Sequence, residues 1–388
     1  MQIKELSECR ILIVDDVKAN VDMLVEALRD EYKLSVALDG DNALKQAGKN
    51  SPDLILLDIM MPGIDGYEVC RRLRAAPATQ EIPVMFLSAL EDVQNKAKGF
   101  EVGGNDYLTK PFEMLEVKAR VKSLLKAKAY ADAVKAAMER DLSIAREIQM
   151  GILPADLSPS TKGTGLDIFA VMEPARQVGG DLYEVLRVDD DHVVVVVGDV
   201  SGKGIPAALF MAVTMTLVRM MARQGLAPHE ILRRLNDELA AQNPRGMFVT
   251  MACLAFDLRS GQVTGASAGH GPLLLLRADQ SSRPVFPSTG MVAGLFPDRP
   301  FTSEYLQLKP GDTLVLFTDG VTDAADPQAE TFGDERVLEC LHGTPGRSAR
   351  ETVEAILGAV REFSAGAPQF DDITLMAVRY VPKEHANT

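Results

Sequence analysis

The sequence predicts two domains of different fold class, α/β followed by α+β, joined by one long helix. In residues 1–125, short apolar runs alternate with amphipathic stretches, as in a doubly wound parallel sheet covered by helices on both faces. From residue 166 onward, apolar runs follow one another in pairs with short turns, which indicates antiparallel sheets with segregated helices. Residues 113–150 contain neither glycine nor proline, so a continuous helix is expected between the two domains.

The length of 388 residues allows at least two hydrophobic cores. We expect the first domain over residues 1–125 and the long helix over 113–153, overlapping the last helix of that domain. The second domain is expected over 160–382, followed by a short tail over 383–388.

Composition and charge narrow the class of protein. The chain is 46% hydrophobic and 25% charged, as is usual for a globular protein, and its net charge is −14. Because no basic stretch offsets this charge, we expect neither nucleic-acid nor anionic-membrane binding. The four cysteines are scattered and form no metal-ligand pair, which favours a reducing cytoplasmic location. We expect no signal peptide and no membrane-spanning segment.

In the first domain, five short apolar runs predict the strands of a parallel sheet. They cover residues 11–14, 33–36, 53–57, 84–87 and 107–108, with helices that include 21–28 and 67–73. Ligands of such sheets bind at the carboxyl ends of the strands, where the strand order reverses.

Polar residues gather at those strand ends. Asp15 and Asp16 follow the first strand, Asp58 closes the third, Ser88 closes the fourth, and Lys110 follows the fifth. Each Asp alone is typical of a turn. Five positions at one edge favour a site, because converging carboxylates repel one another unless a hard cation such as Mg²⁺ lies among them.

The motifs ILIVDD, LILLDIMMPGIDGYEV, FLSA and DYLTKPF occur in order, and together they resemble the response-regulator receiver domain, which has a flavodoxin-like fold. The resemblance implies that Asp58 accepts a phosphoryl group from a sensor histidine kinase. The implied Mg²⁺ ligands are Asp15, Asp16, Asp58 and the backbone carbonyl of Met60. The implied switch residues are Ser88 and Lys110, which would contact the phosphoryl oxygens, and Tyr107 as the aromatic switch.

The long helix carries a narrow apolar seam at three- and four-residue spacing. It comprises Ala131, Val134, Met138, Ala145, Ile148 and Ile152. Such a seam suits a partner helix, so one interpretation is a coiled coil that makes a homodimer and carries a signal between the domains. The alternative is a passive spacer after the last helix of the first domain. The helix is expected to stop at Gly151–Pro154, and the polar segment 156–165 reads as a loop.

In the second domain, strands and helices are expected in the order of an α+β fold. The expected strands are 166–171, 182–187, 193–197, 247–257, 262–268, 272–277, 313–317 and 373–378, and the expected helices are 207–222, 228–240 and 349–363.

Aspartates beside glycines mark the ends of several of these strands. They are Asp181, Asp199, Asp319 and the pair Asp371–Asp372. Glycine lets the backbone approach a metal or phosphate closely, and carboxylates from distant parts of the chain suit a centre of two Mg²⁺ or Mn²⁺ ions. Each Asp taken singly is again typical of a turn.

The motif GDVSGKG, its serine Ser201 and the histidine His270 each allow another functional interpretation. GDVSGKG lacks the spacing of a phosphate-binding P-loop and has Gly204 where Ser or Thr is required. Ser201 lacks a G-x-S-x-G elbow, so it is a poor nucleophile. His270 is either a general base or, more commonly for a histidine at a tight turn, a structural residue.

The motifs VGGDLYE, GDVSGKGIPAAL, SAGHGPLLLL, LKPGDTLVLFTDGVTDA and FDDITLMAVR resemble the SpoIIE-like, RsbU-like branch of the metal-dependent PPM protein phosphatases. The implied fold is a pair of antiparallel sheets flanked by helices. The implied metal ligands and catalytic residues are Asp181, Asp199, Asp319 and Asp371, with the Val200 carbonyl as a backbone ligand. AREIQMGILP resembles the regulatory helix that precedes the catalytic domain in this family.

The chain departs from the usual sequence of this branch at three places, none of which removes an implied metal ligand. Glu184 stands where Asp is frequent, Ser267 where Asn is common, and MVAG where Pro-Leu-Gly is usual, which affects the expected shape of the substrate-facing loops.

The two resemblances together predict a response regulator whose output is a phosphoserine/phosphothreonine phosphatase with two Mn²⁺ or Mg²⁺ ions. The implied substrate is a phosphorylated STAS-domain anti-sigma factor antagonist. Phosphorylation of Asp58 would act through the long helix, whose AREIQ end would order the helices after Gly204, and the sign of control is left open. The alternatives are a phosphorylation-gated adaptor with an inert phosphatase domain and a phosphatase outside sigma-factor control.

Overall fold

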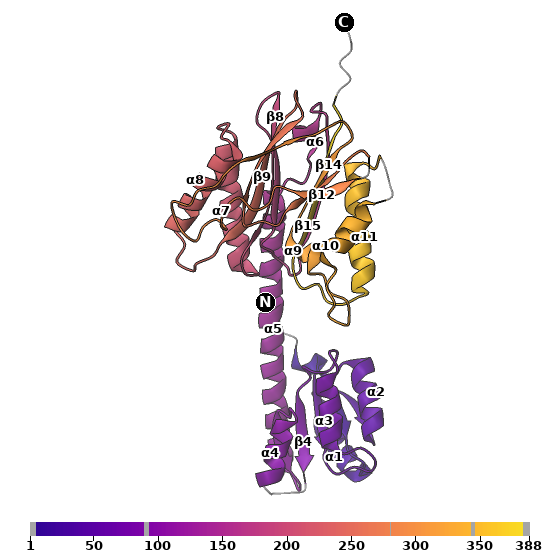
Figure 1. The fold of residues 1–388 in the computed structure, drawn as a ribbon. Helices are drawn as coiled ribbons and strands as arrows, with labels where there is room; N and C mark the ends of the chain where they lie inside the picture. Colours follow the sequence, from indigo (N-terminus) through magenta and orange to yellow (C-terminus); the bar gives the residue numbers. More distant parts are fainter. Residues whose placement is uncertain (1–4, 89–92, 280, 343–345, 383–388) are drawn as a thin grey trace. The chain divides into compact units, whose positions relative to one another are not determined.

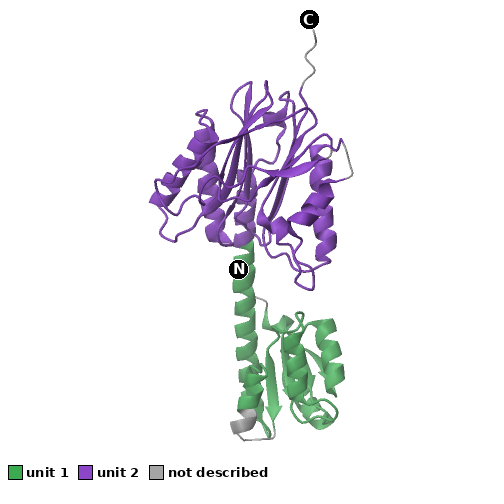
Figure 2. Ribbon diagram, in the orientation of Figure 1, with its two compact units in different colours: residues 1–140 green, residues 141–388 purple. Residues whose placement is uncertain are grey.

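The computed structural model describes residues 5–88, 93–279, 281–342 and 346–382, apart from the side chains of 93–96 (Figure 1). The chain divides into two compact units, Met1–Arg140 and Asp141–Thr388 (Figure 2). The described residues form three five-stranded sheets, one in the first unit and two in the second. The predicted fold class, α/β followed by α+β, is confirmed.

The first unit contains a parallel sheet in the order β2-β1-β3-β4-β5. Its strands are β1 (Arg10–Val14), β2 (Lys33–Ala37), β3 (Leu54–Asp58), β4 (Val84–Ser88) and β5 (Asp106–Thr109). Its helices are α1 (Lys18–Leu28), α2 (Gly40–Asn50), α3 (Gly66–Ala75) and α4 (Val93–Glu101), after a 3₁₀ turn at Leu6–Glu8. The central strands β3 and β4 are buried along their whole length, because helices cover both faces of the sheet. Each sheet face has its own apolar cluster.

Helix α5 (Met114–Ile152) is 39 residues long and continues from the first unit into the second. Its first turns pack on the first unit through Val117, Val121 and Leu125, which are fully or almost fully buried. Ion pairs add to this packing: Lys118 with Glu31, Arg120 with Asp106, and Lys135 with Glu81.

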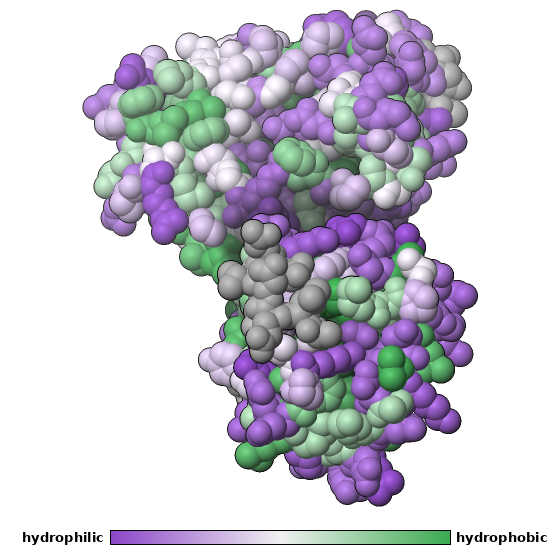
Figure 3. Space-filling view, turned by 90° about the horizontal axis from the view of Figure 1, so that it is seen from below, coloured by the Kyte–Doolittle hydropathy of each residue, from purple (hydrophilic) through white to green (hydrophobic). Residues whose placement is uncertain are grey.

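The predicted seam of α5 lies largely on the solvent side of each unit. Val134, Met138 and Ile148 are 47%, 62% and 63% exposed. The rest of the protein surface on the face seen in Figure 3 is mostly hydrophilic, with scattered hydrophobic patches. Isolated exposed apolar residues are ordinary, but a row at helical spacing on an otherwise polar helix suits a partner helix.

The second unit contains two antiparallel sheets, in the orders β13-β10-β9-β8-β7 and β12-β11-β14-β15-β6. The strands of the first are β7 (Leu182–Arg187), β8 (His192–Val200), β9 (Val249–Asp257), β10 (Gln262–Ala268) and β13 (Glu304–Gln307). Those of the second are β6 (Leu166–Glu173), β11 (Leu273–Leu276), β12 (Ser282–Val285), β14 (Thr313–Phe317) and β15 (Ile373–Tyr380).

Helices cover both outer faces of these sheets (Figure 1). Helices α7 (Ile205–Ala222) and α8 (Pro228–Ala241) pack on the first sheet, and α11 (Ala349–Ser364) packs on β6 and β15 of the second. Three shorter helices complete the unit: α6 (Ser158–Thr161) contacts β6 and β7, α9 (Asp319–Thr322) contacts β15, and α10 (Gly333–Leu341) contacts α9 and α11. The largest apolar cluster holds residues of both sheets together with α7 and α8, and a second one lies under α11.

The structure departs from the predicted elements in several places. The segment predicted as a loop after α5 contains α6, and helices α9 and α10 and strands β12 and β13 were not predicted. Strand β12 has the sequence SRPV, whose proline and charge make it atypical of a strand, and it lies at a sheet edge where proline is tolerated.

Within the described residues, helix α7 is long and apolar enough to cross a membrane, by length and composition alone. One buried face accounts for part of this apolar composition, while Leu209, Val213 and Met220 of the same helix are exposed. Ala207, Met211, Met215 and Val218 are fully buried in the core against the sheet. The same composition is found in core helices, so this test is weak evidence for a membrane span.

Candidate phosphoacceptor and metal centre

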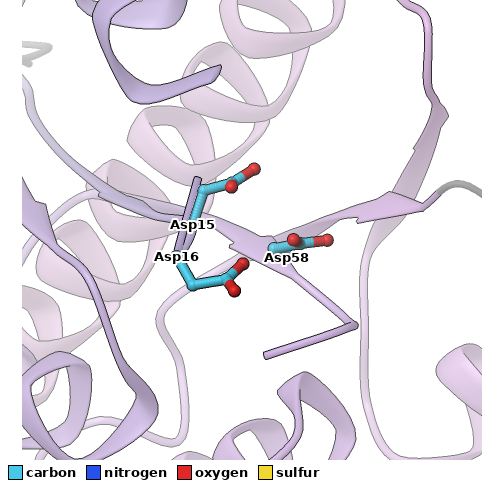
Figure 4. Close-up of side chains that lie close together, drawn as sticks. All are labelled: Asp15, Asp16 and Asp58. Atoms are coloured by element: carbon cyan, nitrogen blue, oxygen red, sulfur yellow. The ribbon is translucent and has the colours of Figure 1, made fainter. Parts of the chain in front are cut away.

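The carboxyl edge of the parallel sheet brings three aspartates together (Figure 4). Asp15 follows β1 and Asp58 ends β3, and a carboxylate oxygen of each lies within 4.8 Å of one from Asp16. Asp15 and Asp58 are buried, whereas Asp16 is exposed. An all-oxygen set with an open side fits a hard cation that keeps some of its water, as Mg²⁺ does.

Lys110 faces this cluster from the residue after β5. Its Nζ lies 2.7 Å from Asp15 Oδ2 and 3.0 Å from Asp58 Oδ2. Burial raises the pKa of Asp58, and Lys110 opposes that rise. The backbone N–H of Met60 also donates to Asp58. Asp15 is held in place by Val17 N at 2.8 Å and by the amide of Asn20.

The predicted switch residues occupy the neighbouring strands. Ser88 is buried at the end of β4. Tyr107 of β5 is buried, its hydroxyl lies 3.1 Å from that of Tyr67, and its ring packs on Phe86. A Cβ at Gly99 of α4 would lie 2.2 Å from the Tyr107 hydroxyl, so this position requires glycine while Tyr107 points inward.

In the second unit, four predicted aspartates lie at strand ends of both sheets. Asp181 precedes β7 and Asp199 lies near the end of β8. Asp319 follows β14 as the first residue of α9, and Asp371 comes just before β15. The two sheets therefore contribute two carboxylates each.

Asp181 links the sheets through hydrogen bonds. Its Oδ2 accepts from the hydroxyl of Thr318 at 2.8 Å and from that of Thr374 at 2.5 Å. Thr318 follows β14 and Thr374 is in β15, so both donors come from the sheet that does not contain Asp181's own strand. Neither threonine was predicted, although both lie inside the motifs that identified the aspartates.

The backbone segments at this site approach so closely that glycine is required. A Cβ at Gly180 would lie 2.6 Å from the Val200 carbonyl oxygen. A Cβ at Gly320 would lie 1.9 Å from the Asp372 carbonyl oxygen. The glycines of the Gly-Asp and Asp-Gly pairs therefore allow the backbone segments that carry the carboxylates to pack closely together.

The carboxylates repel one another. Burial, then Asp319 and Asp371, raise the pKa of Asp199 to about 7. Burial and then Asp199 raise the pKa of Asp181 well above its ordinary value, and burial and then Asp371 raise that of Asp319. Such a cluster is stabilised by divalent cations, and its oxygen donors are those that Mn²⁺ and Mg²⁺ accept. The chemistry of these donors therefore suits divalent cations.

The paired aspartates before β15 have different surroundings. Asp372 is buried and accepts from Ala175 N at 2.8 Å and from Gly180 N at 2.7 Å, one bond on each oxygen. Asp371 instead faces Lys203, whose Nζ lies 3.0 Å from its Oδ2. This arrangement favours Asp371 as the metal ligand and gives Asp372 the task of holding the backbone beside Asp181.

His270 and Ser201 have structural partners. Burial lowers the pKa of His270 to about 4, and its Nε2 lies 3.0 Å from the carbonyl oxygen of Phe317, to which it donates. A neutral histidine used in this way is not placed to exchange protons at pH 7. The Ser201 hydroxyl accepts from Phe248 N at 2.9 Å.

Comparison with known families agrees with this geometry. Residues 11–122 match the response regulator receiver domain, and residues 189–381 match the stage II sporulation protein E (SpoIIE) family. Protein IcfG of Synechocystis is 32% identical over 291 residues, which cover 68% of this chain and 44% of that protein. Response regulator PleD of Caulobacter vibrioides is 41% identical over 169 residues, covering 43% of this chain and 36% of that protein. The chain thus spans less than half the length of these relatives.

Two solved structures share the fold of the second unit. The SiaA-PP2C domain of Pseudomonas aeruginosa superposes with a TM-score of 0.58 at 24% identity, covering 64% of this chain and 99% of that one. The SpoIIE phosphatase domain of Bacillus subtilis, with a fragment of its regulatory domain, gives 0.50 at 20% identity, covering 55% and 62%. Residues 11–122 therefore form a response regulator receiver domain, and residues 189–381 form a domain of the SpoIIE family. The second unit has the fold of the solved SiaA-PP2C and SpoIIE phosphatase domains.

Proposed function

We propose that the chain is a metal-dependent phosphoserine/phosphothreonine protein phosphatase controlled by phosphorylation of Asp58. The observation that carries the proposal is the cluster of carboxylates at the ends of both antiparallel sheets, whose pKa values are raised by burial and then by one another. The proposed ligands are Asp181, Asp199, Asp319, Asp371 and the Val200 carbonyl.

Two Mn²⁺ or Mg²⁺ ions, when bound, supply a hydroxide nucleophile at neutral pH and neutralise charge on the phosphoryl group. The protein's residues hold the ligands in place. Thr318 and Thr374 favour the ionised form of Asp181 by donating to its Oδ2, and Asp372 fixes the backbone of Gly180 beside it. In this mechanism no side chain forms a covalent phosphoenzyme, which agrees with the structural partners of Ser201 and His270.

In the receiver domain, Asp58 is the proposed acceptor for a sensor histidine kinase. The proposed Mg²⁺ ligands are Asp15, Asp16, Asp58 and the Met60 carbonyl. Lys110 already lies 3.0 Å from Asp58, so it is placed to pair with the charge that phosphorylation adds. Ser88 ends β4, the strand next to β3, and Tyr107 lies on β5 beyond it, where both would respond to that change.

The same proposal includes a homodimer partner and a protein substrate. The exposed seam of α5 supports a homodimer through a coiled coil, with Asp58 phosphorylation acting through this helix on the SpoIIE domain. The proposed substrate is a phosphorylated STAS-domain anti-sigma factor antagonist, in keeping with the SpoIIE family match. The proposed location is the cytoplasm, where kinase and substrate would meet.

A direct test measures Mn²⁺-dependent hydrolysis of a generic phosphoester and of a phosphorylated STAS protein. Asp199→Asn and Asp319→Asn should each abolish turnover, whereas Asp190→Asn, at a side chain that is 98% exposed, should not. Turnover that persists in either ligand variant would contradict the proposal. Hydrolysis of the generic ester but not of the phosphorylated STAS protein would place the enzyme outside sigma-factor control. Hydrolysis of neither substrate would favour an adaptor.

The same assay with beryllofluoride, a phosphoryl mimic at Asp58, measures the control. A change of rate together with a doubled mass in light scattering would support the helix as a transmitting element. An unchanged rate and mass would make α5 a spacer.

A further inference from the structure

The last turn of α5 contains one buried polar side chain. Gln149 is 4% exposed, whereas the residues on either side of it, Ile148 and Met150, are 63% and 37% exposed. A buried amide is costly unless its donor and its acceptor are both satisfied. The sequence thus places a residue with a strict requirement on the inner face of this turn.

The donor and the acceptor of the Gln149 amide are both satisfied by one other residue of the second unit, Gly179. Its Nε2 donates to the carbonyl oxygen of Gly179 at 2.6 Å, and its Oε1 accepts from Gly179 N at 3.1 Å. Two hydrogen bonds to the N–H and the C=O of one residue fix the orientation of this backbone segment as well as its position. Leu and Met have a similar size but can make neither bond.

Gly179 is two residues before Asp181, and its other side is occupied. A Cβ there would lie 2.1 Å from Asp372 Oδ2, which also accepts from Gly180 N. The segment 179–181 therefore lies between Asp372 on one side and Gln149 on the other. Asp372 belongs to the phosphatase fold itself, whereas Gln149 belongs to the helix that enters it.

A second set of contacts fixes the end of the same helix. Arg219 of α7 donates to the Ile152 carbonyl and pairs with buried Glu184 of β7. The hydroxyl of Tyr183 donates to the Pro154 carbonyl at 3.2 Å. These bonds hold the helix end so that Gln149 meets Gly179 in one register.

We propose that Gln149 is a positioning residue for the metal centre: by holding Gly179 it keeps Asp181 where a metal ion can bind. This inference rests on the proposed two-metal site. It makes the last turn of α5 a condition for metal affinity, because a shift of that turn would release one of the two anchors of the segment that carries Asp181.

The test uses Gln149→Leu in the full chain, with Asp15→Asn and Asp16→Asn added so that the receiver carboxylates do not contribute. Titration calorimetry with Mn²⁺ alone should show affinity about tenfold weaker than in the parent, as expected for the loss of hydrogen bonds worth about 1.4 kcal/mol. At saturating Mn²⁺ the phosphatase rate should return to near the parent value, since the catalytic ligands are intact.

Two controls separate positioning from general destabilisation. Met150→Ala changes an exposed residue of the same turn, and Val263→Ala removes fully buried methyl groups from β10. Val263→Ala should lower thermal stability and leave Mn²⁺ affinity within about twofold.

Three results would overturn the inference: parent-like Mn²⁺ affinity in Gln149→Leu, an equal loss of affinity in Val263→Ala, or no Mn²⁺ binding by the parent. If the parent binds Mn²⁺ but hydrolyses no phosphoester, the proposed function fails while the affinities still decide the role of Gln149.

Discussion

Replacing Asp199 by asparagine should stabilise the metal-free protein while abolishing its activity. The folded structure raises the pKa of this carboxyl from its ordinary 3.8 to about 7, through burial and then through Asp319 and Asp371. At 1.36 kcal/mol per pKa unit, that difference corresponds to about 4 kcal/mol of destabilisation once the group is ionised. Relaxation of the loops and entry of water reduce this, so we expect a gain of about 2 kcal/mol in Asp199→Asn at pH 8.

The sign of the pH dependence follows from proton binding. Between pH 4 and 7 the folded protein holds a proton on Asp199 that the unfolded chain has lost, so ionisation costs stability as the pH rises through this range. The parent protein without metal should therefore lose stability from pH 5 to pH 8, and Asp199→Asn should lose less.

The assay is urea unfolding in EDTA at pH 5 and pH 8, monitored by a label on the second unit because the two units need not unfold together. Adding Mn²⁺ should reverse the order, since the ion stabilises the parent and not the variant. A variant less stable than the parent at pH 8 in EDTA would refute the mutual repulsion of the carboxylates.

Three further predictions concern packing, ligand support and assembly. Gly320→Ala should destabilise the protein by about 1–3 kcal/mol in urea unfolding, because its Cβ would lie 1.9 Å from a backbone oxygen; Gly358→Ala, in open space, should not. Thr374→Val removes a hydrogen-bond donor to Asp181 and should raise the Mn²⁺ concentration needed for half the maximal rate about tenfold or more; an unchanged Mn²⁺ titration would contradict the role of Thr374 in holding Asp181. Val134→Lys, with beryllofluoride present, should reduce the mass measured by light scattering to that of the monomer with little change in melting temperature; a retained dimer would place the interface elsewhere.

Much of the fold follows from hydrophobic periodicity. The predicted strands 182–187, 262–268 and 313–317 coincide with β7, β10 and β14, since each is an apolar run bounded by turn residues. Strands β12 and β13 are four residues each and largely exposed, so their sequences carry almost no burial signal. Tertiary pairing rather than local sequence determines them.

The aspartates of the candidate site could be proposed from the sequence, whereas the residues that support them could not. Strand-end carboxylates are visible in the sequence because parallel and antiparallel sheets collect strand ends at common edges. Which of Asp371 and Asp372 faces the cluster depends on the hydrogen bonds of Ala175 and Gly180, which are remote in sequence. The pairing of Gln149 with Gly179 likewise joins two positions that no spacing rule connects.

The uninterrupted course of α5 has a consequence for how this protein could be rebuilt. A helix advances about 100° and 1.5 Å with each residue, so one inserted alanine turns everything after it by about 100° about the helix axis. Inserting alanines one at a time after Arg140 should therefore make the response to beryllofluoride oscillate with helical phase, recovering near seven residues. If the response to beryllofluoride were the same after every insertion, the helix would act only by holding the two units near each other. If the response oscillated, the helix would act by its rotation about its axis.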